Sequence, residues 1–367
     1  MECVAVFFGG QSVEHDVSVI TGVIAVNALE KSEYKPIPIY VHNDGTFWTG
    51  DSLFDISNFK SLDFKKLSQV TFVAGSKKVY LLSKRKLKEL AIISAGLNCI
   101  HGDGGEDGCI SGLMKLCDIP FASPDLLGSS VCIDKRFTKI FLKGIGVNCL
   151  EGVSVKSASE YLSGKTKFEY PVIVKPNRLG SSIGINVARN DSQLIEYVSV
   201  ALRYDSQVLI EPCLTGFTEI NCAVYRNSSN QIVVSECEKP ISKNQILTFG
   251  DKYQMGEREF PANIDKSLSN RIKKITKKVY SALSCEGIIR IDYLVVDNKV
   301  YLNELNTVPG SLAYYFFTDT LKGFATLLED LIKRAIQVCL LCDGRVKTYK
   351  SPILADIKGK GCKTLVK

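Results

Sequence analysis

Short apolar runs alternate with segments of helical periodicity along the first 123 residues. Runs rich in β-branched and aromatic residues predict strands at 3–8, 36–41 and 91–100. Apolar positions spaced three and four residues apart predict helices at 16–30 and directly after Gly108. Strands that alternate with helices favour a doubly wound α/β layer, in which ligands lie at the carboxyl ends of the strands. We therefore expect an N-terminal α/β domain over residues 1–123.

The remaining pattern predicts two α+β lobes and a tail. In the central lobe, 124–215, we expect helices at 135–144 and 191–203 and strands at 170–175, 183–187 and 208–211. In the C-terminal lobe, 216–345, we expect strands at 218–225 and 232–238, a polar loop at about 243–260 and helices at 266–283 and after Thr318. The tail, 346–367, is lysine-rich without clear periodicity, which predicts a loosely packed extension.

Two further apolar strands near the C-terminus predict a hairpin with a turn at 297–299. A three-residue turn pairs Asp292 with Glu304 and Arg290 with Asn306, whereas a two-residue turn places the acids on opposite faces. We prefer three residues because apolar positions then match next to the turn. Opposed carboxylates repel unless a cation lies between them, and oxygen ligands suit Mg²⁺. The alternative is a solvated hairpin face with ordinary surface acids.

Composition narrows the class of protein and its partners. The chain of 367 residues, 45% hydrophobic and 23% charged, is typical of a globular protein with two or three domains. It has no apolar stretch long enough for a membrane span and no signal peptide, and its 13 scattered cysteines suit a reducing cytosol. We therefore expect a cytoplasmic protein. The net charge of +7 comes without an aromatic-interleaved basic patch, so a small anionic substrate is expected rather than a nucleic acid.

A small-residue loop at 175–184 follows an apolar strand and begins with Lys175. Its backbone N–H groups, hydroxyls and lysine could contact phosphate oxygens, although a β-hairpin tip gives the same pattern. Lys135 and Lys252 arrive from other segments and could help to neutralise a triphosphate, but each alone is more often a surface lysine. Candidate adenine and ribose contacts at and beyond a strand end are Glu211, Leu214 and Glu219.

Two runs in the first domain carry candidate substrate contacts. The run 9–18 is a strand, a turn and a helix start, in which Glu14 could meet a substrate ammonium or merely belong to a helix cap. The glycine-rich run 101–108 permits tight turns, and His101 and Glu106 could orient a substrate and neighbouring side chains. A lone histidine is more often structural than catalytic.

Together these runs resemble the D-alanine–D-alanine ligase family of the ATP-grasp superfamily over roughly residues 3–340. The matching motifs, in family order, are Gly-Gly-x-Ser-x-Glu at 9–14, His-Gly-x-x-Gly-Glu-Asp-Gly at 101–108, Lys-Pro-x-x-x-Gly-Ser-Ser at 175–182, Lys-Tyr at 252–253, Gly-x-x-Arg-x-Asp at 287–292 and Glu-x-Asn-Thr-x-Pro-Gly at 304–310. Each motif is at most moderately specific, whereas all of them in the family's order are strongly so.

The resemblance implies an ATP-grasp fold, with an N-terminal doubly wound α/β domain and two α+β lobes that enclose the nucleotide. It implies an ADP-forming ligation of two D-alanines to D-alanyl-D-alanine through an acylphosphate, for peptidoglycan precursor synthesis. ATP and two Mg²⁺ ions, with Mn²⁺ as a substitute, are the implied cofactors. A homodimer without nucleic-acid or membrane partners is implied as well.

The resemblance also assigns roles to residues. The implied metal ligands are Asp292, Glu304 and Asn306. The implied ATP contacts are Lys135, Lys175, Ser182, Glu211, Leu214, Glu219 and Lys252. The implied catalytic residues are Glu14, Ser181, Tyr253, Arg290 and Gly310, and the implied substrate-positioning residues are His101, Glu106 and Ser311. The polar loop at about 243–260 would act as a lid over the acylphosphate.

One departure concerns the second substrate. The family commonly has a serine shortly after Asn-Thr-x-Pro-Gly that holds the second carboxylate, and this chain lacks it. Either Ser311, a tyrosine or backbone N–H groups would take that role, or the second site differs. Tyr253, where ligases that form D-alanyl-D-lactate have histidine, favours an amine nucleophile. A ligase for D-alanyl-D-serine or another D-alanyl product, and a non-catalytic nucleotide-binding regulator, are the alternatives.

Overall fold

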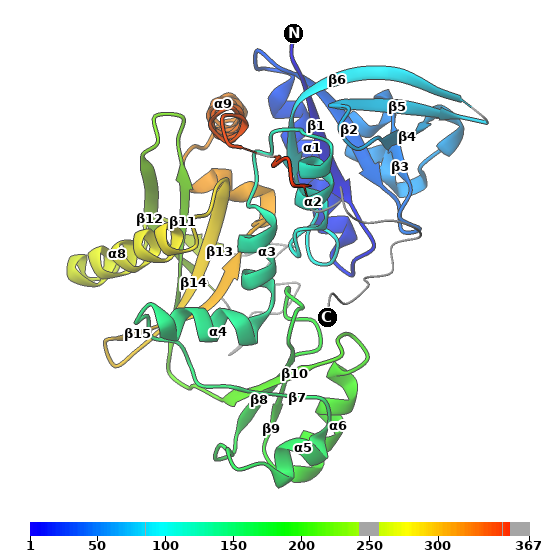
Figure 1. The fold of residues 1–367 in the computed structure, drawn as a ribbon. Helices are drawn as coiled ribbons and strands as arrows, with labels where there is room; N and C mark the ends of the chain where they lie inside the picture. Colours follow the sequence, from blue (N-terminus) through cyan, green and yellow to red (C-terminus); the bar gives the residue numbers. More distant parts are fainter. Residues whose placement is uncertain (85, 242–256, 347, 353–367) are drawn as a thin grey trace.

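The computed structural model describes residues 1–84, 86–241, 257–346 and 348–352. These residues form three sheets, which Figure 1 shows at the upper right, the bottom and the left of the molecule. Among the described residues, no helix is both long and apolar enough to span a bilayer. The predicted lid and tail lie mostly outside the described residues, and the predicted domain boundaries stay predictions.

The first sheet is built on β1 (Cys3–Gly9), whose apolar residues are buried on both faces. Phe7 and Phe8 point to opposite faces and belong to separate core clusters, because side chains alternate along a strand. β1 pairs in parallel with β2 (Lys35–Val41) and with β6 (Lys86–Asn98). The segments that complete this part are α1 (His15–Leu29), η1 (Asp51–Phe54), η2 (Ile56–Ser61), η3 (Phe64–Lys66) and α2 (Cys109–Leu116).

Antiparallel strands that the sequence did not predict extend this sheet and close it into a barrel. They follow β2 in the order β3 (Phe47–Thr49), β4 (Ser68–Phe72) and β5 (Lys78–Ser83), and β5 then pairs with the first half of β6. The predicted strand at 91–100 therefore begins earlier, at Lys86. The parallel core of β2, β1 and β6 keeps the α/β arrangement that the pattern predicted.

The second sheet has the order β7 (Val153–Val155), β10 (Val208–Pro212), β8 (Val172–Pro176) and β9 (Asn186–Ala188). Its helices are α5 (Ala158–Ser163) and α6 (Asp191–Ala201). Two helices, α3 (Leu126–Ile133) and α4 (Lys135–Gly144), lead into it from the first sheet. Asp134 caps α4 by accepting a hydrogen bond from the Phe137 N–H at 3.0 Å, which fixes where Lys135 begins the helix.

The third sheet is antiparallel, in the order β13 (Glu257–Glu259), β12 (Ile232–Ile241), β11 (Thr218–Arg226), β14 (Ile288–Val296) and β15 (Lys299–Asn306). Helix α8 (Lys266–Ala282) covers one face. On that side the buried Tyr293 and Thr276 hydroxyls lie 2.7 Å apart. Arg290 and Asp292 lie on the opposite face, since residues two apart share a face and Tyr293 points the other way.

The β14–β15 hairpin corrects one prediction and confirms another. The predicted three-residue turn is wrong, because Val296 pairs with Lys299 around a two-residue turn of residues with φ of 48° and 60°. Both residues lie in the left-handed region, as a type I′ turn requires. A β-bulge then adds Asn303 to β15, so the predicted pairing of Asp292 with Glu304 is confirmed. The shorter turn and the bulge each shift the register by one residue, in opposite directions, so Asp292 and Glu304 still face each other.

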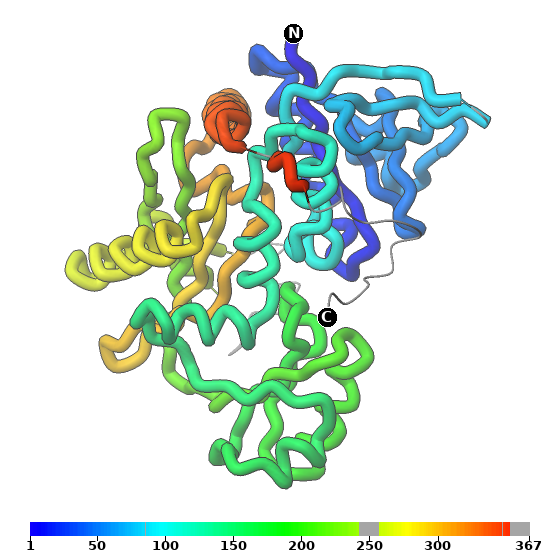
Figure 2. The backbone as a smooth tube through the Cα atoms, viewed as in Figure 1, coloured from blue at the N-terminus to red at the C-terminus, as the bar shows by residue number. Residues whose placement is uncertain are grey.

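The chain then returns to the first sheet. After β15 comes the short segment η4 (Gly310–Phe316), followed by α9 (Leu321–Asp343), which Figure 2 shows in orange and red near the blue N-terminus. Phe324 and Leu328 of α9 share a core cluster with Val26 and Leu29 of α1. This packing joins α1 to α9 and brings the residues after β15 against the first sheet.

Candidate active site

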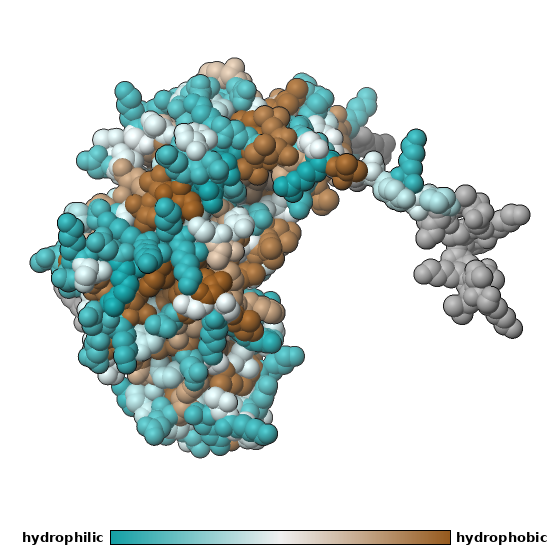
Figure 3. Space-filling view, turned by 60° about the vertical axis from the view of Figure 1, so that its left-hand side comes forward, coloured by the Kyte–Doolittle hydropathy of each residue, from teal (hydrophilic) through white to brown (hydrophobic). Residues whose placement is uncertain are grey.

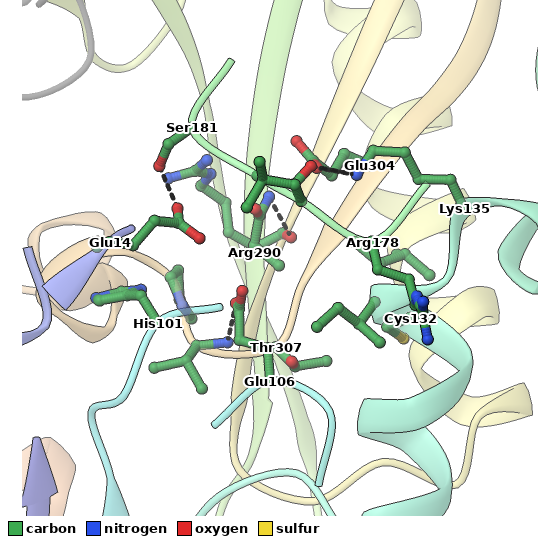
Figure 4. Close-up of a pocket in the computed structure, with 18 residues that line it drawn as sticks. Glu14, His101, Glu106, Cys132, Lys135, Arg178, Ser181, Arg290, Glu304 and Thr307 are labelled. Carbon is green, nitrogen blue, oxygen red and sulfur yellow. Dashed lines mark hydrogen bonds and ion pairs between the residues drawn. The ribbon is translucent and has the colours of Figure 1, made fainter. Parts of the chain in front are cut away.

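Two neighbouring cavities lie where the three sheets meet. The first is lined by Glu14 at the start of α1, by the loop after β6 and by residues after β15 (Figure 4). The second extends between the second and third sheets, over β8, β10 and β14. Both are lined by Lys135 and Glu304, and these two side chains therefore stand at the junction.

The first cavity has an acidic wall. The Ser181 hydroxyl donates a hydrogen bond to the Glu14 carboxylate, and both side chains are buried. Glu106 accepts hydrogen bonds from the Val308 N–H at 3.1 Å and the Gly102 N–H at 3.2 Å. Burial, and then the charge of Glu14, raise the pKa of Glu106, and the two N–H groups only partly oppose this. A buried and a half-buried carboxyl in one cavity suit a cationic ligand group such as an ammonium.

The paired hairpin residues form the next wall. Arg290 Nε and Nη2 donate to Asp292 Oδ1 and Oδ2 at 2.7 and 2.9 Å, and Asn306 Nδ2 donates to Oδ2 at 2.9 Å. On the other strand of the hairpin, Glu304 Oε1 lies 3.2 Å from Lys135 Nζ of α4. Burial opposes the charge of Arg290, but Asp292 outweighs it and raises the pKa of the guanidinium. Each carboxylate is therefore already neutralised by a basic side chain.

The hairpin residues of this wall offer oxygen atoms to a divalent cation. No group of three or more His, Cys, Asp or Glu side chains is arranged as a metal site within the described ranges. Asp292 and Glu304 offer carboxylate oxygens and Asn306 offers a carboxamide oxygen, and hard cations such as Mg²⁺ prefer oxygen ligands. Mg²⁺ usually takes one or two carboxylates and completes its shell with substrate phosphates. The residues thus fit Mg²⁺ bound together with a phosphate group.

The second cavity combines a buried ion cluster with apolar walls. Glu211 Oε2 lies 2.5 Å from Lys175 Nζ, and Lys139 pairs with the other carboxylate oxygen. Burial opposes ionisation of Glu211, but the two lysines outweigh it and lower its pKa. Burial also lowers the pKa of Lys175, although Glu211 opposes this. Other side chains that line the cavity are Leu150, Ile173, Ser182, Val187, Leu214, Phe217, Glu219 and Leu294.

The second cavity, with its apolar walls and its buried lysines, suits a planar base with an anionic tail.

Comparison with known proteins identifies the family. Residues 3–124 match the family model described as D-ala D-ala ligase N-terminus, and residues 142–337 match that described as D-ala D-ala ligase C-terminus. The chain belongs to the D-alanine–D-alanine ligase family. The fold class expected from the sequence, ATP-grasp, is confirmed.

Individual members of the family match this chain over nearly its full length. The D-alanine–D-alanine ligase of Thermosipho melanesiensis is 35% identical, covering 91% of this chain and 93% of the relative. The crystal structure of the enzyme from Helicobacter pylori superposes with a TM-score of 0.75 at 30% identity, covering 91% and 98%. The VanG D-Ala:D-Ser ligase from Enterococcus faecalis superposes with a TM-score of 0.76 at 25% identity, covering 91% and 99%.

Most residues predicted from the ligase motifs line one of the two cavities. Ser311 does not; its N–H donates instead to the Thr21 hydroxyl at 3.0 Å. Lys252 and Tyr253 lie outside the described residues. The sequence pattern did not single out Lys139, although it lies one helical turn after Lys135 on α4 and its spacing of four residues was a usable signal. It also missed Arg178, which lines the first cavity and pairs with Asp205 at 2.6 Å.

His101 is held uncharged in this ligase-family site. It is buried, and its Nε2 lies 2.8 Å from the Thr21 hydroxyl. Burial lowers the pKa of His101 to about 4; the Val308 backbone opposes this, and the charge of Arg290 adds to it. At neutral pH the imidazole therefore accepts and donates hydrogen bonds without carrying charge.

This depressed pKa predicts a loss of stability in acid. The unfolded chain takes up a proton near pH 6.5, whereas the folded chain does so only near pH 4. The unfolded state binds more protons in this window, so the free energy of unfolding falls by up to about 3 kcal/mol as pH drops through it. Urea unfolding from pH 7 to 4 measures the slope, and His101→Gln should flatten it. An unchanged slope in that variant would assign the acid sensitivity to other groups.

Proposed function

We propose that this chain joins two D-alanines into D-alanyl-D-alanine, with ATP converted to ADP and phosphate, for peptidoglycan precursor synthesis. The observation that supports this best is the pair of adjoining cavities, one with an acidic wall and one with apolar walls and buried lysines. Lys135 and Glu304 at their junction mark the place where the substrate carboxylate and the γ-phosphate would meet.

The first cavity would hold the donor D-alanine. Glu14, oriented by Ser181, would bind its ammonium, and Glu106 would add a second carboxyl. Arg290 and the Gly310 N–H would hold the oxyanion that develops when the acylphosphate is attacked, because fixed donors stabilise charge that appears in the transition state. Tyr253 would complete the contact with Ser181, as in the family motif.

The second cavity would hold ATP. The apolar walls and Leu214 would bind the adenine, while Glu211 and Glu219 would lie toward the base and ribose. Lys135, Lys175, Lys252 and Ser182 would contact the phosphates. Asp292, Glu304 and Asn306 would hold two Mg²⁺ ions, or Mn²⁺ in their place. When bound, these ions neutralise phosphate charge.

A tyrosine would replace the serine that this chain lacks in the acceptor site. Tyr315 is largely buried beside Arg290, and the Arg258 guanidinium carbon lies 4.4 Å from its ring centroid. Its hydroxyl and the two guanidinium groups suit an acceptor carboxylate. This assignment leaves Ser311 to position the backbone through its N–H, which is already bonded to Thr21.

The surface and the cysteines bear on quaternary structure and location. Polar side chains cover most of the face shown in Figure 3, with apolar patches between them. Exposed apolar side chains include Leu126, Leu127, Phe137 and Ile140 on α3 and α4, which a second copy in a homodimer would cover. Cysteines of the described ranges are free thiols, which suits the cytoplasm. No nucleic-acid or membrane partner is included in the proposal.

The test is the product formed from ATP, Mg²⁺, D-alanine and equal amounts of D-serine and D-lactate. We expect D-alanyl-D-alanine as the main product by mass, with one ADP released per dipeptide. An excess of D-alanyl-D-serine would reassign the acceptor. ATP binding without turnover on any D-amino acid would favour the nucleotide-binding regulator instead.

A further inference from the structure

The segment from Val308 to Ser311 is fixed at both ends by residues of the first sheet's connections. The Val308 N–H donates to Glu106, and the Val308 backbone favours the protonated form of the His101 ring and raises its pKa, as a carbonyl acceptor does. At the other end, the Ser311 N–H donates to the Thr21 hydroxyl at 3.0 Å. Gly310, whose N–H is proposed to hold the oxyanion, lies between these anchors.

The protonation pattern of His101 follows from its two neighbours. A carbonyl oxygen can only accept, so the ring nitrogen that faces Val308 carries the proton. Nε2 faces the Thr21 hydroxyl at 2.8 Å, which assigns the proton to Nδ1 and makes Nε2 an acceptor. The Thr21 hydroxyl therefore donates to His101 while it accepts from the Ser311 N–H. Two hydrogen bonds thus link Ser311 through Thr21 to His101.

The backbone that the Thr21 hydroxyl holds is strained. Ser311, Leu312 and Ala313 each have φ of 50°, in the left-handed region that residues with a Cβ rarely adopt. Such conformations persist only where the surroundings impose them. Thr21 is 1% exposed on α1, and its hydroxyl reaches the first residue of the strained run directly.

We propose that Thr21 is a positioning residue, whose hydroxyl holds the His101 ring and the strained turn so that Gly310 is placed for ligation. Its consequence for turnover rests on the proposed function, but its hydrogen bond to His101 in the free protein does not. Thr21 touches neither cavity, so it acts through His101 and the backbone of Ser311.

The test compares Thr21→Val, which removes the hydroxyl at nearly constant shape, with Thr21→Ser, which keeps it. We expect Thr21→Val to lower kcat by about 10- to 100-fold, since small misplacements of reacting groups carry costs of this size. The KM for ATP should change less than about twofold, because the nucleotide cavity is separate. Thr21→Ser should restore most of kcat.

The matched control is Thr276→Val, which removes another buried helical hydroxyl, bonded to Tyr293 on the far face of the third sheet. It should reduce stability as much as Thr21→Val does, without lowering kcat. If both variants lost kcat in proportion to stability, Thr21 would be a structural residue only and the proposal would fail.

A spectroscopic measurement separates this proposal from the function itself. The chain has only three histidines, so ¹⁵N resonances of their ring nitrogens can be assigned by replacement. Wild-type His101 should show a protonated Nδ1 and an unprotonated Nε2. Thr21→Val should leave the proton on Nδ1 and shift the Nε2 resonance, because Nε2 loses its hydrogen-bond donor. An unchanged Nε2 resonance in Thr21→Val would overturn the proposal even in an active enzyme. A shifted Nε2 resonance in a protein that ligates nothing would instead count against the proposed function.

Discussion

Replacing Glu304 by glutamine should give a folded protein with ligation reduced by about 10²-fold or more. The carboxylate stands at the junction of the two cavities, opposite Asp292 and 3.2 Å from Lys135 Nζ. The amide keeps the shape but loses the charge that would hold Mg²⁺ and that neutralises Lys135. ADP release measured against Mg²⁺ concentration should show a higher Mg²⁺ requirement as well as a lower maximal rate.

Asp297→Asn is the matched control for this change. Asp297 lies in the exposed turn of the same hairpin, and asparagine tolerates its positive φ of 48°. The control removes one negative charge from the same two strands and should leave turnover unchanged. Turnover like that of the wild type in Glu304→Gln, at every Mg²⁺ concentration, would refute the metal assignment.

The same hairpin shows what the sequence could and could not predict. Alternation along β14 and β15 correctly indicated two strands with acids facing each other. The turn length was wrong, because an Asp-Asn pair that accepts positive φ at both positions makes a tighter turn than apolar matching suggested. The bulge at Asn303 had no signal of its own in the pattern, yet it decides which face Glu304 occupies.

The antiparallel strands that close the first sheet were not predicted, for a different reason. β3 has only three residues, and the first half of β6 is exposed and carries charged side chains such as Lys86, Lys88 and Glu89. Neither has the apolar period that marks a half-buried strand. Pairing with β5 stabilises this part of β6 through backbone hydrogen bonds, which are invisible in a hydrophobic pattern.

Family motifs located the cavity residues but not the contacts that support them. Thr21 and Tyr315 lie outside every motif, and their neighbours come from segments about 80 to 290 positions away or from separate strands. Such contacts depend on the packing of α1 against α9 and η4, which only the folded chain shows. The motifs also gave no indication that Glu106 accepts a hydrogen bond from the Val308 N–H.

Arg290→Lys should reduce ligation by about 10²- to 10³-fold while the protein stays folded. The guanidinium donates to both oxygens of Asp292, at 2.7 and 2.9 Å, and the side chain is 16% exposed. A lysine keeps the charge, but a single ammonium cannot make this two-point contact or hold an oxyanion at the same time. Asp292 would retain the hydrogen bond from Asn306, so the structural cost should be limited.

The ratio of products identifies which step depends on Arg290. If the guanidinium holds the oxyanion of the second step, the acylphosphate will form faster than the amine can capture it. Water will then hydrolyse part of it to D-alanine and phosphate, and ADP release will exceed dipeptide formation. Arg271→Lys is the matched control, because Arg271 makes its contacts with Asn298 on the protein surface. It should leave both rate and ratio unchanged. A slower Arg290→Lys enzyme that still yields one dipeptide per ADP would place Arg290 in the first step, as the residue that orients Asp292 rather than the oxyanion.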